Sequence, residues 1–146
     1  MFTHLFHEQK EDKVIGSGFD LWKDSNLYNT LLENILGAIQ TFCPQNWTYG
    51  IANAWMGIYK EDQRTKSHKH EPCYKSFCYY ISSEEPHTPM VFDELGIEID
   101  AITDRLIIFP SNLLHSVPPC RNKERIMIAG NIIPLMDKQK MFTMQK

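Results

Sequence analysis

Features that would tie the protein to a membrane or to a secretory route are scarce in this sequence. No apolar run approaches the length that spans a membrane, and Met1–His4 do not begin a basic region followed by an apolar one, as in a secretory signal. The four cysteines fit no disulfide framework in a chain of this size, so we expect reduced thiols. Together these absences predict a cytoplasmic protein.

An excess of basic charge is also lacking. Lys and Arg number 15 against 18 for Asp and Glu, which gives a formal net charge of -3. A general nucleic-acid binder carries a basic surface, so the charge argues against that class of partner. No internal repeat or low-complexity segment divides the chain. Its 146 residues suffice for a real core, and we expect a single domain over residues 1–146.

One amphipathic helix is expected in the first third of the chain. Asp24, Ser25 and Asn26 are good helix caps, and Pro44 ends the pattern. Before them, residues 14–19 contain only a weak strand-and-turn pattern. Between them, apolar residues at helical spacing form a stripe that predicts packing on a sheet. The stripe consists of Leu27, Leu31, Ile35, Ile39 and Phe42.

After the helix, the pattern changes to short strands separated by turn signals, which is typical of a jelly-roll sandwich or barrel. A charged loop is expected over residues 60–67, and a loose helix or frayed end after Pro134. In the second strand, alternation assigns Ser76, Cys78 and Tyr80 to one face. The expected strands are Tyr49–Tyr59, Tyr74–Ile81, Pro89–Phe92, Gly96–Ile102, Arg105–Phe109, Ser116–Val117 and Arg125–Ile133.

Two histidines stand close together at the entrance to an apolar run, in the stretch Ser67–Pro72. In a strand, residues i and i+2 face the same side, so the side chains of His68 and His70 would point to one place. Two imidazoles aimed at one point form part of a metal site, which needs a third ligand from elsewhere in the chain. His115, which follows a very apolar strand, is the candidate for that ligand.

An arginine begins the last expected strand. A guanidinium pairs bidentately with a carboxylate, so a fixed Arg125 can hold a dicarboxylate by its far end while the near end chelates a metal. Two close histidines, a distal histidine and then an arginine suggest an iron site with a carboxylate-binding cation beside it. The plainer alternative makes Arg125 a surface partner of Glu124 or Asp104.

These pieces together resemble the Fe(II)- and 2-oxoglutarate-dependent oxygenases, and most closely the small stand-alone members related to prolyl hydroxylases. The resemblance runs from about Tyr49 to Ile133 and rests on the order and spacing of short motifs. The motifs are Asn53-Ala-Trp55, Ile58-Tyr59, His68-Lys-His70-Glu-Pro72, Phe77-Cys-Tyr79-Tyr80-Ile81, Ile107-Ile-Phe109-Pro-Ser111, His115-Ser-Val117 and Arg125-Ile-Met-Ile-Ala-Gly-Asn131.

The resemblance implies a mainly β fold, a double-stranded β-helix of the cupin-like jelly-roll type. Its core would span about residues 47–134, behind a strand and covering helix at about residues 1–46. The implied reaction hydroxylates a peptidyl side chain or a small molecule with O₂ while 2-oxoglutarate is decarboxylated to succinate. The implied site residues are His68, His70 and His115 for Fe(II), and Arg125, Tyr59 and Tyr80 for the 2-oxoglutarate cosubstrate.

The second metal ligand departs from the family pattern. The common family pattern has Asp or Glu two residues after the first histidine, whereas this chain carries His70, a His-x-His pattern that some small relatives share. Three neutral imidazoles would leave Fe(II) with its full charge, which dianionic 2-oxoglutarate would neutralise. Glu71 is the alternative carboxylate, although in a regular strand it would point to the opposite face unless a bulge intervened.

Other hypotheses exist for the same residues. His70 favours a cupin-like protein that binds metal through three histidines and does not use 2-oxoglutarate, while a non-catalytic jelly-roll binding module would need no metal. Cys73 and Cys78 with the nearby histidines would form a zinc cluster, but the usual Cys-x2-Cys pair is absent. The remaining histidines, His4, His7 and His87, lie in weakly patterned segments and are expected to be solvated.

Overall fold

The computed structural model describes residues 26–137, and within them the chain forms one helix followed by eight strands. The segment at residues 14–19 and the expected caps Asp24 and Ser25 lie outside the described residues. The elements are α2 (Asn26–Phe42), β1 (Trp47–Lys60), β2 (Thr65–His68), β3 (Lys75–Ser83), β4 (Pro89–Phe92), β5 (Ile97–Asp100), β6 (Leu106–Pro110), β7 (His115–Val117) and β8 (Glu124–Asp137).

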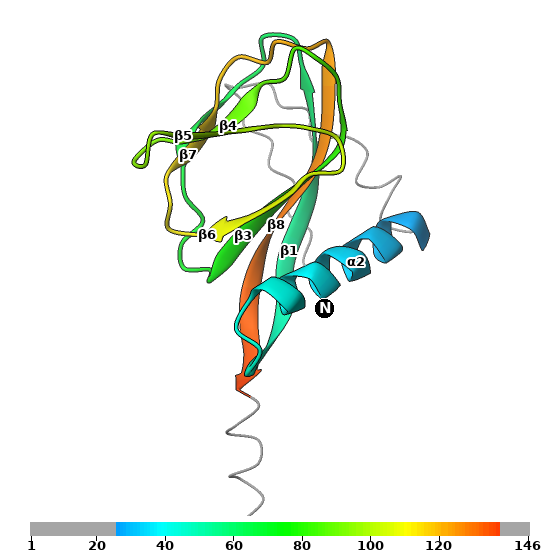
Figure 1. The fold of residues 1–146 in the computed structure, drawn as a ribbon, viewed down its shortest axis with the longest axis vertical. Helices are drawn as coiled ribbons and strands as arrows, with labels where there is room; N and C mark the ends of the chain where they lie inside the picture. Colours follow the sequence, from blue (N-terminus) through cyan, green and yellow to red (C-terminus); the bar gives the residue numbers. More distant parts are fainter. Residues whose placement is uncertain (1–25, 138–146) are drawn as a thin grey trace, which may run out of the picture.

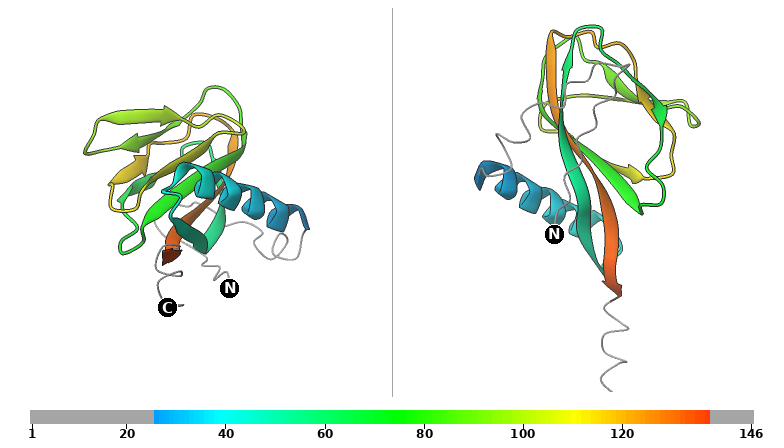
Figure 2. Two further views of the ribbon diagram at one scale, coloured as in Figure 1. Left: turned by 60° about the horizontal axis from the view of Figure 1, so that its bottom comes forward. Right: turned by 180° about the vertical axis from the view of Figure 1, so that it is seen from behind.

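The strands form two four-stranded sheets, one in the order β1-β8-β3-β6 and the other in the order β2-β7-β4-β5. Neighbouring strands pair antiparallel in both sheets. The two sheets face each other, and α2 crosses the outer side of the first sheet (Figures 1 and 2). This is the predicted mainly β fold, a double-stranded β-helix with a covering helix before it.

The helix covers the first sheet with a stripe that differs from the predicted one. Leu31 is half-buried and packs against the core, whereas Phe42 is 79% exposed, so the prediction for Phe42 was wrong. The neighbouring stripe has the same helical spacing but carries Tyr28, an aromatic residue, and ends in Cys43 beyond the last turn. Its buried members are Tyr28, Leu32, Ile35, Ile39 and Cys43, and they pack with Ile51, Ala54, Ile128 and Ile132 of the sheet.

Alternation along β3 and β1 places one set of side chains toward the helix and the other set between the two sheets. In β3, Phe77 belongs to the helix-side core, whereas Cys78 and Tyr80 belong to the core between the sheets, as predicted. In β1, the pairing with β8 shifts between Ile51 and Asn53. This irregularity places an odd-numbered and an even-numbered residue, Ile51 and Ala54, in the same core.

Most strand ends differ from the predictions by one or two residues, and two differences are larger. The loop expected over residues 60–67 ends earlier, because Thr65 begins β2. The last strand does not stop before Pro134 but continues to Asp137. β3 begins only at Lys75, opposite Ile132, so within the described residues β8 pairs beyond that point with β1 alone. A proline is tolerated on such a one-sided stretch because its missing N–H interrupts no second ladder.

Two findings bear on the environment of the chain. Within residues 26–137, no helix combines the length and the apolarity that crossing a bilayer requires. All four cysteines fall in this range and carry free thiols, as expected, and three of them are buried. Burial raises the pKa of the Cys78 thiol to about 11, against the opposing charge of Arg125, so this thiol stays neutral and unreactive near neutral pH.

We predict opposite stability effects for two glycine-to-alanine substitutions. A Cβ at Gly130, on β8, would lie 2.5 Å from the Asn53 carbonyl oxygen and 2.6 Å from the Phe77 ring. Gly130→Ala should therefore lower the free energy of unfolding by about 1–3 kcal/mol. A methyl group at Gly37, within α2, would meet no atom within 4 Å outside the backbone of its own helix. Gly37→Ala should raise the free energy of unfolding by about 0.5–1 kcal/mol.

Urea denaturation of both variants and the parent chain measures these changes. An unchanged midpoint for Gly130→Ala would contradict the close approach of β1 and Phe77 to the β8 backbone.

Candidate metal centre

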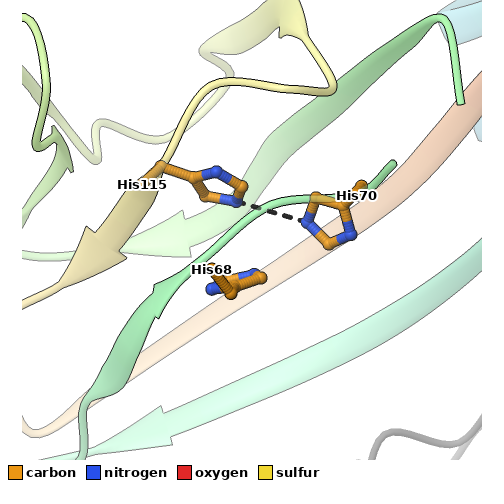
Figure 3. Close-up of side chains that lie close together, drawn as sticks. All are labelled: His68, His70 and His115. Atoms are coloured by element: carbon orange, nitrogen blue, oxygen red, sulfur yellow. Dashed lines mark hydrogen bonds between the residues drawn. The ribbon is translucent and has the colours of Figure 1, made fainter. Parts of the chain in front are cut away.

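Three imidazoles meet at one end of the second sheet. His68 ends β2 and lies directly opposite His115, the first residue of β7. His70 joins them, and one ring nitrogen from each of the three histidines lies within 4.8 Å of the others (Figure 3). The Nε2 atoms of His70 and His115 are 3.2 Å apart. Metal–nitrogen bonds of ~2.1 Å place two ligand nitrogens roughly 3.0–3.5 Å apart, so this pair already has a suitable spacing.

Backbone carbonyl groups orient two of the rings. The Nδ1 atom of His115 lies 2.9 Å from the Leu113 oxygen, and that of His68 lies 2.8 Å from the Lys66 oxygen. A carbonyl only accepts, so each Nδ1 carries the proton and each Nε2 keeps a lone pair for a metal. Burial lowers the pKa of His115, and the nearby His68 lowers it further by a smaller amount. The lowered pKa favours the neutral ring of His115, which can bind a cation.

His70 reaches this site in a way that was not predicted. Strand β2 ends at His68, so His70 lies in the following loop and does not share a strand face with His68. Its backbone N–H donates to the Ser111 carbonyl at 2.8 Å, which ties the loop to the turn between β6 and β7. Its ring also lies beside Trp55, with the ring centroids 5.6 Å apart. A tertiary contact, not strand alternation, brings the two close histidines together.

The alternatives for the second ligand are not supported by the geometry. The Glu71 side chain is 52% exposed and forms an ion pair with Lys69 at 3.1 Å. It does not belong to the cluster, whose members are His68, His70 and His115. The zinc hypothesis fails as well, because Cys78 is buried in the core between the sheets and no cysteine of the described chain joins the cluster.

The predicted arginine and its two tyrosines also come together. Arg125 is only 1% exposed, so the surface ion pairs with Glu124 and Asp104 that were the alternative do not form. Its guanidinium carbon lies 4.2 Å from the centre of the Tyr59 ring and 5.5 Å from that of Tyr80. One nitrogen, Nη1, donates to the Thr88 carbonyl at 3.1 Å, while Nε has no hydrogen-bond partner among the described residues.

Both tyrosines keep their phenolic protons. Burial raises the pKa of Tyr80 well above its ordinary value, and it raises the pKa of Tyr59 in spite of the nearby Arg125 charge. The Tyr59 hydroxyl bonds to the Thr65 hydroxyl at 2.6 Å, whereas the Tyr80 hydroxyl is buried without a partner in the described part of the chain. Unpartnered buried polar atoms are costly. Arg125 Nε and the Tyr80 hydroxyl are therefore two donors with unused capacity in one region of the core.

Sequence reasoning missed several residues around the histidines. The Asp93 carboxylate accepts from Ser67 and from Ser116, each at 2.9 Å. These serines are the chain neighbours of His68 and His115, so one carboxylate ties the two histidine strands together. The only sequence signal was a serine beside each histidine. His87, expected to be solvated, is instead half-buried, and its Nδ1 is buried with no partner from residues 26–137.

A groove of about 660 Å³ opens next to the loop that carries His70. It is open to solvent on one side, and its size is in the range of small-molecule sites. Its lining comes from the segment after His70, the turn between β6 and β7, and the one-sided end of β8. The lining residues are Glu71, Pro72, Cys73, Tyr74, Asn112, Ile133 and Pro134.

Comparison with known proteins gives matches in structure only. No protein-family profile matches the sequence. No curated protein matches it either. An oxidoreductase of the 2OG-Fe(II) oxygenase family from Burkholderia pseudomallei superposes with a TM-score of 0.60 at 14% identity, over 73% of this chain and 57% of that one.

Two prolyl hydroxylases are also similar. The viral collagen prolyl hydroxylase of Paramecium bursaria Chlorella virus-1, solved as a 2OG complex, has a TM-score of 0.54 at 16% identity, over 74% of this chain and 71% of that one. A prolyl-4-hydroxylase from Pseudomonas putida has a TM-score of 0.53 at 18% identity, over 75% and 65%. At such identities the likeness establishes the fold, and the fold is the one that the resemblance implied.

We predict that His70, and not Glu71, is needed for metal binding. His70→Ala should weaken binding of Co²⁺ or Fe²⁺ by more than about 100-fold, because even the hydrogen-bond partners of metal ligands contribute about 10–100-fold. Glu71→Gln, which changes an exposed neighbour in the same loop, should bind like the parent chain. Anaerobic calorimetric titration of tag-free protein measures both. Equal losses of metal affinity in the two variants would contradict the assignment of His70 as a metal ligand.

Proposed function

We propose that the protein is an Fe(II)- and 2-oxoglutarate-dependent oxygenase. His68, His70 and His115 would hold the metal, and Arg125, Tyr59 and Tyr80 would hold the far carboxylate of 2-oxoglutarate. When bound, the metal and cosubstrate supply the oxidation of a substrate by O₂, coupled to decarboxylation of 2-oxoglutarate to succinate. The fold shared with the 2OG-Fe(II) oxygenases supports this proposal without establishing the reaction.

The observation that carries the proposal is the buried charge of Arg125. No carboxylate among the described residues forms an ion pair with it, although its side chain is 1% exposed. A buried cation without a counter-charge is strongly destabilising, and the faces of two aromatic rings compensate only in part. A carboxylate from a bound dianion would supply the missing charge. It would also accept from Arg125 Nε and from the Tyr80 hydroxyl, the two donors with unused capacity.

The charge of the metal site points to the same ligand. Three neutral imidazoles add no negative charge to Fe(II), so the site favours an anionic chelator more than a site with a carboxylate would. 2-Oxoglutarate carries two carboxylates, one for each end of the proposed site. The apolar side chains around His115, including Phe92 and Phe109, exclude water from the metal end of the site. Exclusion of water would strengthen the electrostatic interactions of the bound dianion with the metal and with Arg125.

We place the substrate in the groove beside His70. The groove combines apolar walls from Pro72, Ile133 and Pro134 with the polar side chains of Glu71 and Asn112. It therefore suits a side chain or small molecule that has both an apolar body and a polar group. Assays with peptides and with free metabolites would show which of these two kinds of substrate the protein oxidises.

We predict that Arg125→Met loses cosubstrate affinity and keeps metal affinity. Removing one partner of a buried charge pair costs about 2–5 kcal/mol, so the KM for 2-oxoglutarate should rise at least about 30-fold. Arg105→Met is the matched control, because its guanidinium also donates to a backbone carbonyl, that of Asp100, but at an exposed position. Succinate release and Fe²⁺ titration are measured for both variants. Parallel loss of metal and 2-oxoglutarate binding in Arg125→Met would refute the assigned role.

The second candidate function is a cupin-like metalloprotein that does not use 2-oxoglutarate, and the presence of His70 in place of a carboxylate favours it. We predict that anaerobic addition of 2-oxoglutarate to the Fe²⁺ protein produces the visible charge-transfer band of a chelated 2-oxoacid. Succinate, which has no keto group, is the control and should give no band. An Fe²⁺-loaded protein that shows no band with 2-oxoglutarate would favour the cupin-like function instead.

A further inference from the structure

We infer that a row of hydrogen-bonded polar side chains, the buried Asn131, Ser76 and Ser111 and the half-buried Asn53, positions His70 as a metal ligand. This row is called the polar row below. The inference rests on the proposed metal centre, and it adds positioning residues that act through His70 without touching the metal. Its basis is a set of hydrogen bonds that leads across three strands and ends at the loop that carries His70.

The polar row follows the register of the first sheet. Asn131 on β8 lies opposite Asn53 on β1 and opposite Ser76 on β3. The Asn131 amide donates to the Asn53 side-chain oxygen at 2.8 Å, and the Ser76 hydroxyl donates to the Asn131 oxygen at 2.8 Å. Ser76 also contacts the Ser111 hydroxyl at 2.9 Å. The Ser111 carbonyl then accepts the His70 backbone N–H at 2.8 Å.

The direction of each bond follows from the number of protons available. A serine hydroxyl has one proton, and that of Ser76 is used on Asn131. The Ser111 hydroxyl must therefore donate to Ser76. Every bond in the polar row thus has one defined donor and one defined acceptor, and the row holds the Ser111 turn in a single orientation. Replacing Ser111 by alanine removes the donor that attaches this turn to the sheet.

Burying the polar side chains of this row costs free energy, which their hydrogen bonds offset. Ser76 on β3 and Ser111 in the turn after β6 are each 1% exposed, and Asn131 on β8 is 5% exposed. The neighbouring residues of these strands in the core between the sheets are apolar. Hydrogen-bonded polar groups in a core specify one arrangement more than they add stability. The arrangement specified here is that of the turn between β6 and β7, to which the His70 backbone is bonded.

The other two histidines are positioned by different means. His68 and His115 are register partners in the β2–β7 pair, and Asp93 bonds to the serine next to each of them. His70 lies beyond the end of β2 and therefore outside this strand pair. Disruption of the polar row should therefore affect the contribution of His70 to metal binding and spare the contributions of His68 and His115.

The test is a double-mutant cycle of Ser111→Ala and His70→Ala, read as Co²⁺ affinity of the full-length chain. Ser111→Ala should weaken Co²⁺ binding about 10–100-fold, the usual effect of losing a positioning partner of a ligand. In the His70→Ala background, the same substitution should cause no further loss, because its effect acts through His70. The visible absorption of the Co²⁺ complex of Ser111→Ala should also shift toward that of His70→Ala.

Two further variants separate positioning from general damage to the fold. Ser111→Thr keeps the hydroxyl donor and should retain most of the Co²⁺ affinity. Ser83→Ala removes another buried serine hydroxyl from β3, one that accepts from Asn122, and should bind Co²⁺ like the parent chain at a similar cost in melting temperature. If Ser111→Ala does not fold, Ser76→Ala breaks the next bond of the polar row and replaces it in the cycle.

The outcomes are distinct. Unchanged Co²⁺ affinity in Ser111→Ala, or an equal loss with and without His70, overturns the inference. A parent chain that binds no Co²⁺ overturns both the inference and the proposed metal centre. A cycle with the expected non-additivity, in a protein that forms no succinate from 2-oxoglutarate, supports the inference and rejects only the proposed reaction.

Discussion

The pairing of β8 with β1 on one edge and with β3 on the other is the constraint on which the rest of the structure depends. One face of β8 carries Ile128 and Ile132, which α2 covers. The opposite face carries Arg125 near its start and Asn131 farther along. Because alternation is fixed once the register is fixed, a slip of one residue would expose the apolar face and expel the arginine from the core. Gly130 allows the close approach of strands that holds this register.

The proposed site combines two features. Arg125 is a buried cation that lacks a counter-ion among the described residues, and the histidine cluster contains no negatively charged ligand. Each feature alone would be a weak argument, because aromatic rings can shelter a guanidinium and histidines can bond to each other. Within one fold they are complementary, since a single dianion would place one negative charge at each end. Under the proposed function, the cosubstrate would therefore supply much of the negative charge of the site.

Sequence patterns predicted most of the fold and the members of the histidine cluster, and particular residues show where they failed. Strict alternation in β3 assigned Phe77 and Tyr80 to the correct faces, because successive side chains of a regular strand point to opposite sides. The helix stripe was predicted only in part, because Leu31 and Leu32 fit the same period equally well and the buried Tyr28 was missed. The position of His70 was predicted for the wrong reason, since its bond to Ser111 is a long-range contact that leaves no periodic trace. The polar row was visible only as Ser76 and Asn131 on otherwise apolar faces.

The one-sided end of β8 has a further consequence for the behaviour of the molecule in concentrated solution. Beyond Ile132, the described part of the chain leaves one edge of this strand unpaired, next to the exposed side chains of Tyr74 and Leu135. A free edge beside apolar side chains is a template for adding a strand from another molecule. Pro134 lies in the middle of this edge and offers no N–H to an incoming strand. Pro134 thus disfavours edge-to-edge aggregation at the part of β8 that lines the groove.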